Sequence, residues 1–302
     1  MVRPKIYFHT LSISGFSDKQ KGLAFVCSMI NNMFPTIKRV LLCKPTYFAV
    51  DFVINPHMKL GSVDTGRAML QWNNLVTALT GSGIKADIIK QEKGLPDMVF
   101  ATDQGIVQND AIVLANFRFD ERKKETTYYR EWFISHGFKI KTIDKELAFE
   151  GGGNTQFFGD ILFVGIGFRA TAKSCDALSE QLSVKVLPLE IIDPYYYHLD
   201  TCYVTIDNDS AFYYPPAFSE QSCDLLKSVV RNLYKLTKTE AEGFAANSFV
   251  SGNTIFIQAN LPSFKAKLEA LGKKVIEVDV SEFHKAGGGI HCLINPLEKK
   301  YD

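Results

Sequence analysis

One stretch of the sequence places a potential nucleophile directly after a flexible loop. In Ala286-Gly-Gly-Gly-Ile-His-Cys-Leu293, three glycines precede a histidine and Cys292. Glycine lets the backbone take positive φ and approach a ligand closely, and a thiol delivered by such a loop is a suitable nucleophile. A buried structural cysteine beside a turn is the alternative, because cysteine is among the residues most often buried. The stretch alone leaves both interpretations open.

Acidic groups and a histidine occur in comparable surroundings elsewhere. Glu150 precedes a second glycine triplet in Phe149-Glu-Gly-Gly-Gly-Asn154. In Tyr197-His-Leu-Asp-Thr-Cys202, an extended backbone would direct His198 and Asp200 to the same face. Imidazole titrates near neutrality, and a neighbouring carboxylate favours its charged form. These residues are candidates for acid and base roles, with a solvated glutamate and a packed histidine as the alternatives.

Two aspartates and two arginines complete the candidate set. Asp103 heads a predicted strand, whereas Asp97 follows a proline and is either a helix cap or a ligand contact. Arg118 and Arg169 each follow a predicted strand, and arginine in a loop suits bidentate capture of a carboxylate. A surface ion pair with a neighbouring carboxylate explains Arg118 equally well.

The combination of a thiol, a histidine, several carboxylates and flanking arginines has a chemical preference. The carboxylates would bind a planar cation with several N–H donors, and the arginines an acid group at its far end. Free arginine or an N-substituted arginine meets both demands. No spacing of histidine, cysteine and carboxylates indicates a metal site. His291 should point away from the thiol as its strand neighbour, with a supporting role at the site as the alternative. The remaining histidines are expected to be structural or exposed: His9, His57, His136 and His284.

The elements that must position these residues recur as a ββαβ unit. Two-residue turns such as Asn109-Asp110 and Gly159-Asp160 fall at matching places between predicted strands. The units cover residues 102–143, 155–189, 202–236 and 248–278. A fifth unit combines both ends of the chain: Ile290–Ile294 pairs with Arg39–Cys43, followed by a helix over 65–79 and a strand over 85–89.

One such unit cannot bury a core by itself. Five units closing through the termini therefore predict a five-bladed α/β propeller as one domain over residues 1–302, and an ordinary α/β sheet is the alternative. The segment of about 1–36 lies outside the repeat, as an extension or a lid. In the ring, five residues at or just before the first strand of their unit should face one mouth: Asp103, Asn154, Asp200, Asn247 and Cys292.

Bulk composition excludes several other classes. Hydrophobic residues at 46% and charged residues at 22% are typical of a globular chain. A formal net charge of +1 gives no argument for nucleic acid or an anionic membrane as a partner, and no apolar run approaches the ~18–20 residues that span a bilayer. The N-terminus lacks the features of a signal peptide. Six scattered cysteines favour a reduced, cytoplasmic setting. A homo-oligomer is compatible with the sequence, which leaves the oligomeric state open.

Several motifs together resemble the amidinotransferase/arginine deiminase superfamily. They are Pro96-Asp-Met-Val-Phe with Asp103, Phe117-Arg with Glu121-Arg122, Phe149-Glu-Gly-Gly, His198-Leu-Asp200 and Gly287-Gly-Gly-Ile-His-Cys292. The resemblance covers the chain from about Val40 onward and implies the fivefold pentein fold. The superfamily includes arginine deiminase, dimethylarginine dimethylaminohydrolase and glycine amidinotransferase.

Position by position, the resemblance implies that Cys292 attacks a guanidinium carbon and forms a covalent S-alkylthiouronium intermediate. His198 would protonate the leaving amine and then activate water, and no cofactor would be needed. The guanidinium would be held by Asp103, Glu150 and Asp200, and the α-carboxylate by Arg118 and Arg169. Further candidates for substrate contacts are Asp97, Asn154 and Asn247.

The chain departs from the superfamily pattern in three respects. Asn154 stands where many relatives have aspartate after the glycines, which weakens a charge role there. Asp103 stands where some bacterial relatives, including arginine dihydrolases, have asparagine, and it favours a single C–N cleavage. The chain is also shorter than arginine deiminases, and we expect it to lack their extra helical domain.

The sequence therefore predicts a cysteine-dependent hydrolase that converts arginine or an N-methylated arginine to citrulline. An amidinotransferase passing the group to an amine acceptor is one alternative, and an arginine dihydrolase giving ornithine is another. A different class of protein is a catalytically silent pentein that only binds a ligand or partner, such as a ribosome-associated anti-association factor. The intact set of cysteine, histidine and acids argues against this last alternative.

Overall fold

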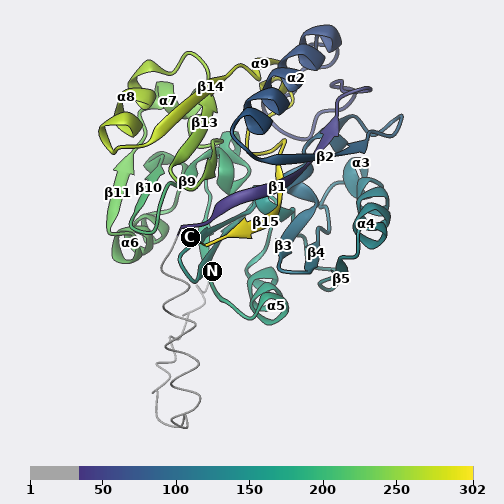
Figure 1. Cartoon of the computed structure of the whole chain (residues 1–302). Helices are drawn as coiled ribbons and strands as arrows, with labels where there is room; N and C mark the ends of the chain where they lie inside the picture. Colours follow the sequence, from purple (N-terminus) through teal and green to yellow (C-terminus); the bar gives the residue numbers. More distant parts are fainter. Residues whose placement is uncertain (1–33, 302) are drawn as a thin grey trace.

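The computed structural model describes residues 34–301. In this range, five three-stranded sheets form a ring, and the longer helices lie on its outside (Figure 1). This is the predicted five-bladed arrangement rather than a continuous α/β sheet. The predicted extension or lid, about residues 1–36, lies outside the described residues except for its last positions. No helix in the described range is long and apolar enough to cross a membrane.

All five sheets share one topology, as expected for a repeat. A leading strand pairs antiparallel with a central strand, which pairs in parallel with a third strand at the outer edge. Four sheets follow the chain in order: β3 (Gly105–Gln108), β4 (Ala111–Leu114) and β5 (Lys139–Lys141); β6 (Thr155–Phe158), β7 (Ile161–Ile166) and β8 (Lys185–Glu190); β9 (Tyr203–Thr205), β10 (Ser210–Tyr213) and β11 (Asn232–Lys235); β12 (Phe249–Ser251), β13 (Thr254–Gln258) and β14 (Lys274–Val278).

The fifth sheet closes the ring from the two ends of the described chain. It consists of β15 (Asn295–Lys300), β1 (Thr36–Lys44) and β2 (Lys85–Lys90), and β1 and β15 lie side by side in Figure 1. The predicted strand Ile290–Ile294 is wrong, because the backbone turns there before β15 begins. The N–H groups of Leu293 and Ile294 donate to the carbonyls of Gly289 and His291, which closes local turns instead of a strand ladder.

Local sequence explains the hairpins that start three of the units. Asn109, Gly159 and Gly252 occupy the first position of two-residue turns and take positive φ of 55°, 59° and 55°. Such turns match the twist of paired strands, and asparagine and glycine tolerate the positive φ that they require. The turn residues therefore determine the strand register before any long-range contact forms.

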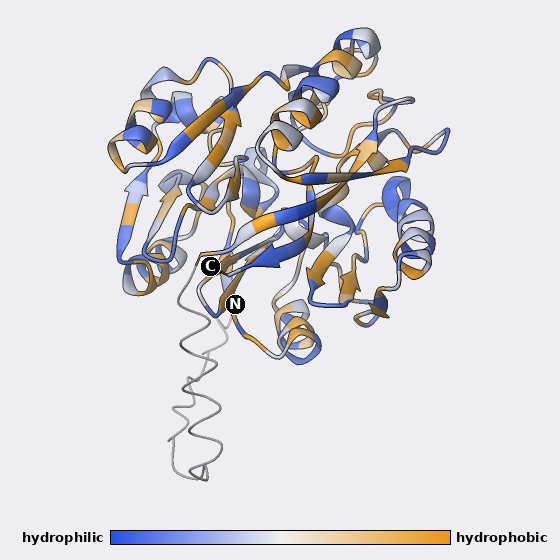
Figure 2. Ribbon diagram, in the orientation of Figure 1, coloured by the Kyte–Doolittle hydropathy of each residue, from blue (hydrophilic) through white to orange (hydrophobic). Residues whose placement is uncertain are grey.

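The helices cover the outer side of the sheets. The longer ones are α2 (Thr65–Gly81), α4 (Glu125–Ser135), α5 (Ala172–Leu182), α6 (Glu220–Val229) and α8 (Pro262–Ala270). In Figure 2, strands such as β4 and β13 are largely orange, β15 is largely blue, and the outer helices alternate between blue and orange. In the ββαβ unit over residues 102–143, the helical part is divided into α3 (Asp120–Lys123) and α4. Two short helices were not expected: α7 (Lys238–Glu242) and α9 (Ser281–His284).

Substitution of Leu41 tests the contribution of the closing sheet to stability. Leu41 in β1 is fully buried and pairs with Asn295 of β15 and Asp87 of β2. Leu41→Ala should lower the free energy of unfolding in urea by about 2–5 kcal/mol, because it leaves a cavity between closely packed strands. Leu70→Ala removes a leucine that is 61% exposed and should change it by less than about 0.5 kcal/mol. Equal effects of the two substitutions would contradict this account.

Candidate active site

The residues just before the five leading strands come together at one end of the ring. Asp103 lies in the 3-10 turn Ala101–Gln104, Asp200 in the turn Leu199–Thr201, and Asn154 follows the turn Gly151–Gly153. The turn Gly151–Gly153 contacts both of the other turns. Asn247 and Cys292 complete the group, and all five side chains are buried. The repeat thus brings side chains that are far apart in the sequence to a common point.

The thiol of Cys292 is held by an amide and a carboxylate. Asn247 Nδ2 donates to Sγ at 3.0 Å, and the thiol lies 3.2 Å from Asp200 Oδ2. Asn247 Oδ1 also accepts from the Cys292 backbone N–H at 3.2 Å. Close packing explains two of the preceding glycines: a Cβ on Gly288 would lie 2.2 Å from the Phe100 ring, and one on Gly289 would lie 2.8 Å from Asn247.

In the free protein, the surroundings favour the protonated forms of both the Cys292 thiol and the Asp200 carboxyl group. Burial raises the pKa of Cys292 well above its usual value, and the charges of Asp200 and Asp103 raise it further. Burial and the neighbouring Asp103 likewise raise the pKa of Asp200. Because these carboxylates disfavour ionisation of the thiol, a cation placed beside them would promote formation of the thiolate.

His198 is paired with Glu150, which differs from the predicted pairing with Asp200. Its Nε2 lies 2.8 Å from Glu150 Oε2, and its Nδ1 lies 3.8 Å from Asp103 Oδ1. The expectation fails because residues 199–201 form a 3-10 turn, so that His198 and Asp200 do not alternate along a strand. Although burial opposes ionisation of Glu150, Arg169 and His198 lower the pKa of that carboxyl to about 2.

The two candidate arginines have different surroundings. Arg169 is buried and donates to Glu150 Oε2 at 2.9 Å and to the Ile54 carbonyl at 2.8 Å. Its Cζ lies 4.6 Å from the centroid of the Phe119 ring and 4.7 Å from that of the Tyr197 ring. Arg118 is exposed, and its Nη1 donates to the Phe168 carbonyl at 2.6 Å. Its backbone N–H donates to Glu150 Oε1 at 3.2 Å. Within residues 34–301 Arg118 forms no ion pair, so the surface-pair alternative is wrong.

A buried ion cluster behind the site was missed by sequence reasoning. Arg122 Nη1 donates to Asp103 Oδ2 at 2.7 Å, and its Nη2 donates to Glu125 Oε2 at 2.9 Å. Gln104 Nε2 donates to the same Glu125 oxygen at 2.6 Å. Arg122 is part of a recognised motif, but its helix is polar and nothing in that pattern predicted burial. The cluster leaves one oxygen of Asp103 pointing into the site.

Asp97 belongs to the same buried region. Burial raises its pKa to about 8, and its side chain makes no hydrogen bond to the described residues, so the helix-cap alternative is wrong. Asn154 has a clear positioning contact, because its Oδ1 accepts from the Glu150 backbone N–H at 3.0 Å. This carbonyl oxygen can accept without carrying charge, which is consistent with asparagine at this position.

The other histidines divide as follows. His57 is partly buried with its Nε2 3.0 Å from the Tyr195 carbonyl, His136 is exposed, and His284 is partly buried and stacked on Phe244. His9 lies outside the described residues. His291 differs from the prediction, since its Nδ1 lies 3.3 Å from Asp200 Oδ2 instead of pointing away. Its position follows from the turn that replaces the predicted strand.

Several buried polar atoms around the thiol have no hydrogen-bond partner in the described part of the chain. They are Asp97 Oδ1, Asp103 Oδ1, Asp200 Oδ1 and His198 Nδ1. Buried polar groups in native proteins are almost always satisfied, so such a group of atoms indicates the position of a polar ligand. Three of the four are carboxylate oxygens, which can accept from N–H donors. Among residues 34–301, no group of side chains is arranged to hold a metal ion.

The segment between β1 and α2, residues 45–64, lies against the same residues. The Ile54 carbonyl accepts from Arg169, and Asn55 Nδ2 donates to the Ala286 carbonyl at 3.0 Å. From the other side, Tyr197 donates from its hydroxyl to the Gly287 carbonyl at 2.8 Å. These contacts bury the catalytic candidates, with Cys292 and His198 each only 1% exposed.

The closed ring of five units with a thiol, an imidazole and acids at one end has the architecture of the pentein superfamily. Within it, the chain belongs to the family described as eukaryotic N,N-dimethylarginine dimethylhydrolase, whose model matches residues 50–299. An N(G),N(G)-dimethylarginine dimethylaminohydrolase of Mycobacterium tuberculosis is 33% identical over 85% of this chain and 85% of its own length. The family and its relatives support a hydrolase that acts on the amidine group of guanidino compounds.

Two further relatives carry a different activity. A bifunctional arginine dihydrolase/ornithine cyclodeaminase of Nostoc is 35% identical over 84% of this chain, which spans 37% of that protein. The structure of the N-terminal domain of ArgZ, a cyanobacterial arginine dihydrolase bound to product, is similar with a TM-score of 0.84 and 33% identity, over 86% of this chain and 97% of that domain. The relatives thus agree on the type of substrate but differ in the reaction product.

Removal of the Arg122 guanidinium tests the buried cluster. Arg122→Met should lower the free energy of unfolding by about 3–5 kcal/mol, because Asp103 and Glu125 would remain buried without their counter-charge. Lys123→Met is the matched control, since Lys123 is an exposed neighbour paired with the exposed Asp120. It should leave the urea unfolding midpoint unchanged. A midpoint for Arg122→Met equal to that of the control would contradict a structural role for the cluster.

Proposed function

We propose that this enzyme cleaves one C–N bond of the guanidino group in free arginine or an N-methylated arginine and releases citrulline with ammonia or a methylamine. The observation that carries the proposal is the set of unpartnered carboxylate oxygens beside the buried thiol. A guanidinium is planar, positively charged and rich in N–H donors, which matches acceptors that are negatively charged and lack partners.

In the proposed first step, the Cys292 thiolate attacks the guanidinium carbon between Asp103, Glu150 and Asp200. The cation itself promotes this step, because its charge offsets the carboxylates that raise the pKa of the thiol. His198 gives a proton to the departing amine as the C–N bond breaks. The product of this step is an S-alkylthiouronium that is still positively charged and still held by the acids.

In the second step, His198 takes a proton from a water molecule that attacks the same carbon. The C–S bond then breaks, the remaining hydroxyl proton passes to the departing sulfur, and a neutral ureido group is formed with the Cys292 thiol restored. Glu150 holds His198 through its 2.8 Å contact, and Asn247 holds the sulfur at 3.0 Å. Asn154 acts through Glu150, and Asp97 adds a further acceptor at the guanidinium end.

The neutral product supports a single cleavage. Citrulline lacks the charge that the carboxylates attract, so a second attack by the thiol on the same carbon loses its electrostatic support. The negative charge of Asp103 contributes to this preference for a positively charged substrate over a neutral product. Arginine dihydrolase activity is the second candidate, because the structure with a TM-score of 0.84 belongs to an enzyme with that activity.

A substrate panel with complete product analysis tests the proposal. The protein is incubated separately with arginine, N-monomethylarginine and asymmetric dimethylarginine, and citrulline, ornithine, ammonia and methylamines are quantified. We expect one amine per citrulline from at least one substrate and no turnover by Cys292→Ser, because the hydroxyl is a far weaker nucleophile than a thiolate. Ornithine with two ammonia would establish the dihydrolase, and a product that requires an added amine acceptor would establish a transferase. Undiminished activity in Cys292→Ser would refute the mechanism.

Arg118 is the proposed contact for the α-carboxylate, together with Arg169. Arg118→Leu should lower kcat/KM for arginine by about tenfold or more, the usual magnitude for a lost charge-assisted hydrogen bond. The loss should appear mainly in KM, because the α-carboxylate takes no part in the reaction and would be bound equally strongly in the ground state and the transition state. The slower reaction of agmatine, which lacks the α-carboxylate, should be unaffected. Arg130→Leu, at another exposed arginine, is the control. Equal losses for arginine and agmatine would show that Arg118 does not bind this group.

A further inference from the structure

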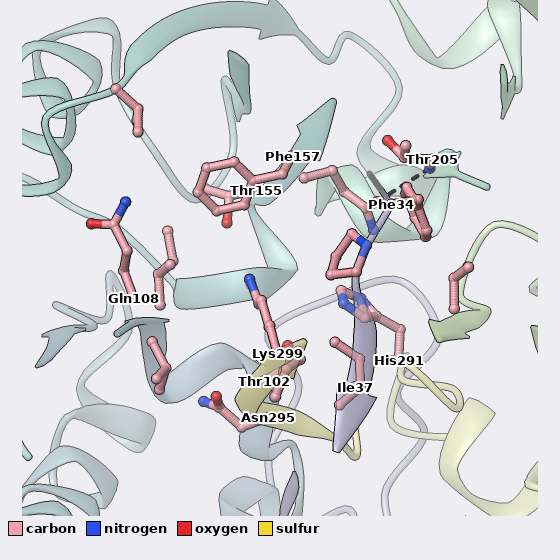
Figure 3. A pocket seen from close by; sticks show the side chains of 18 of the residues that line it. Phe34, Ile37, Thr102, Gln108, Thr155, Phe157, Thr205, His291, Asn295 and Lys299 are labelled. Atoms are coloured by element: carbon pink, nitrogen blue, oxygen red, sulfur yellow. Dashed lines mark hydrogen bonds between the residues drawn. The ribbon is translucent and has the colours of Figure 1, made fainter. Parts of the chain in front are cut away.

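The axis of the ring contains a second space that the catalytic proposal does not use. It is a cavity of about 610 Å³, lined by residues of all five leading strands. Val107, Thr155, Thr205, Val250 and Lys299 represent β3, β6, β9, β12 and β15 in this lining. Figure 3 shows the cavity with Lys299 directed towards Thr155 and Phe157. The cavity therefore occupies the centre of the ring along the leading strands.

The cavity and the catalytic group are separate. Cys292, His198, Glu150 and Asp200 do not line it. Its lining includes residues close in the chain to the catalytic candidates: Thr102 precedes Asp103, Gly152 lies two positions after Glu150, and His291 precedes Cys292. His291 connects the two sides, because its Nδ1 lies 3.3 Å from Asp200 Oδ2 while its ring also lines the cavity. His291 is thus shared by the cavity lining and the catalytic group.

Lys299 supplies a positive charge inside this cavity. Its Nζ lies 5.1 Å from the centroid of the Phe157 ring, and within residues 34–301 it forms no ion pair. Burial lowers the pKa of Lys299. Asp160 and Glu298 also line the cavity, but both are exposed and neither pairs with Lys299. A partly desolvated ammonium group without a counter-charge is unfavourable, and a bound anion would relieve that cost.

The rest of the lining suits an anion that carries a carbon skeleton. Gln108 and Gln156 contribute amide groups, and Gln156 Oε1 accepts from the Thr205 backbone N–H at 3.3 Å. The Gln156 amide nitrogen has no partner among the described residues, so it can donate to an oxyanion. Ile106, Val107 and Val250 add apolar surface.

We propose that the central cavity is a binding site for a small organic carboxylate, with Lys299 as its charged contact and Phe157 as one wall. The ammonium of Lys299 pairs with the carboxylate, amide N–H groups donate to it, and the carbon skeleton lies against the apolar strand residues. The volume is sufficient for a molecule of a few to about a dozen non-hydrogen atoms together with water. The site is distinct from that of the guanidino substrate, and occupancy requires no turnover.

Calorimetric titration of the full chain tests the proposal. The chain is titrated with succinate, and separately with inorganic phosphate, at constant ionic strength. We expect saturable binding of one succinate by the wild type and by Lys300→Gln, a matched loss of charge at the next residue of β15. Lys299→Gln should weaken binding about tenfold or more, and Lys299→Arg should retain it. Circular dichroism and unfolding midpoints establish that the variants are folded.

Four results would overturn the proposal. The first is no saturable binding of succinate by the wild type, and the second is equal binding by Lys299→Gln. Loss of binding in Arg118→Leu with retention in Lys299→Gln would place the anion at the substrate site instead. Phosphate binding more tightly than succinate would exclude an organic acid as the preferred ligand. None of these results depends on whether the enzyme turns over arginine, so the two proposals fail independently.

Discussion

The structure depends on holding several carboxyl groups close together away from water. Asp97, Asp103, Glu150 and Asp200 are all buried at one end of the ring, where their mutual repulsion is poorly screened. The chain compensates part of this charge with its own guanidinium groups: Arg122 binds one oxygen of Asp103, and Arg169 binds one oxygen of Glu150. The protein therefore shows in its own contacts how these acids hold a guanidinium, and Asp97, Asp103 and Asp200 each keep one oxygen without a hydrogen-bond partner in the described range.

The repeat explains how such a cluster can be assembled. Each unit places one of these residues shortly before its leading strand, so the shared topology brings the five positions together regardless of side-chain type. The five units therefore have nearly the same backbone, but the side chains that they supply to the site differ. One unit supplies the thiol, two supply aspartates, and two supply asparagines that hold Glu150 and the sulfur in position.

The repeat could be predicted from sequence because its signals are local. Turn residues such as Asn109 and Gly159 and the short apolar runs beside them define the hairpins within a few positions. The errors concern features determined by tertiary contacts. Ile290–Ile294 is apolar like a strand, but the glycine loop continues turning and pairing begins only at Asn295. The partner of His198 is Glu150, which lies in a different unit and could not be found from neighbours in the sequence. Arg122 gave no sign of burial because a charged residue on a polar helix normally faces solvent.

Closure of the ring by β1 and β15 has a consequence for the order of folding during synthesis. Thr36 and Lys300 are paired in the structure, yet they leave the ribosome at opposite ends of translation of the described chain. Pairing of this kind has a high contact order and forms late. The buried acids of the middle units are therefore synthesised well before the strand that completes their enclosure. A nascent chain could keep these carboxylates hydrated and charged until β15 arrives, so that desolvation of the acids and delivery of the adjacent Cys292 would occur in one final event.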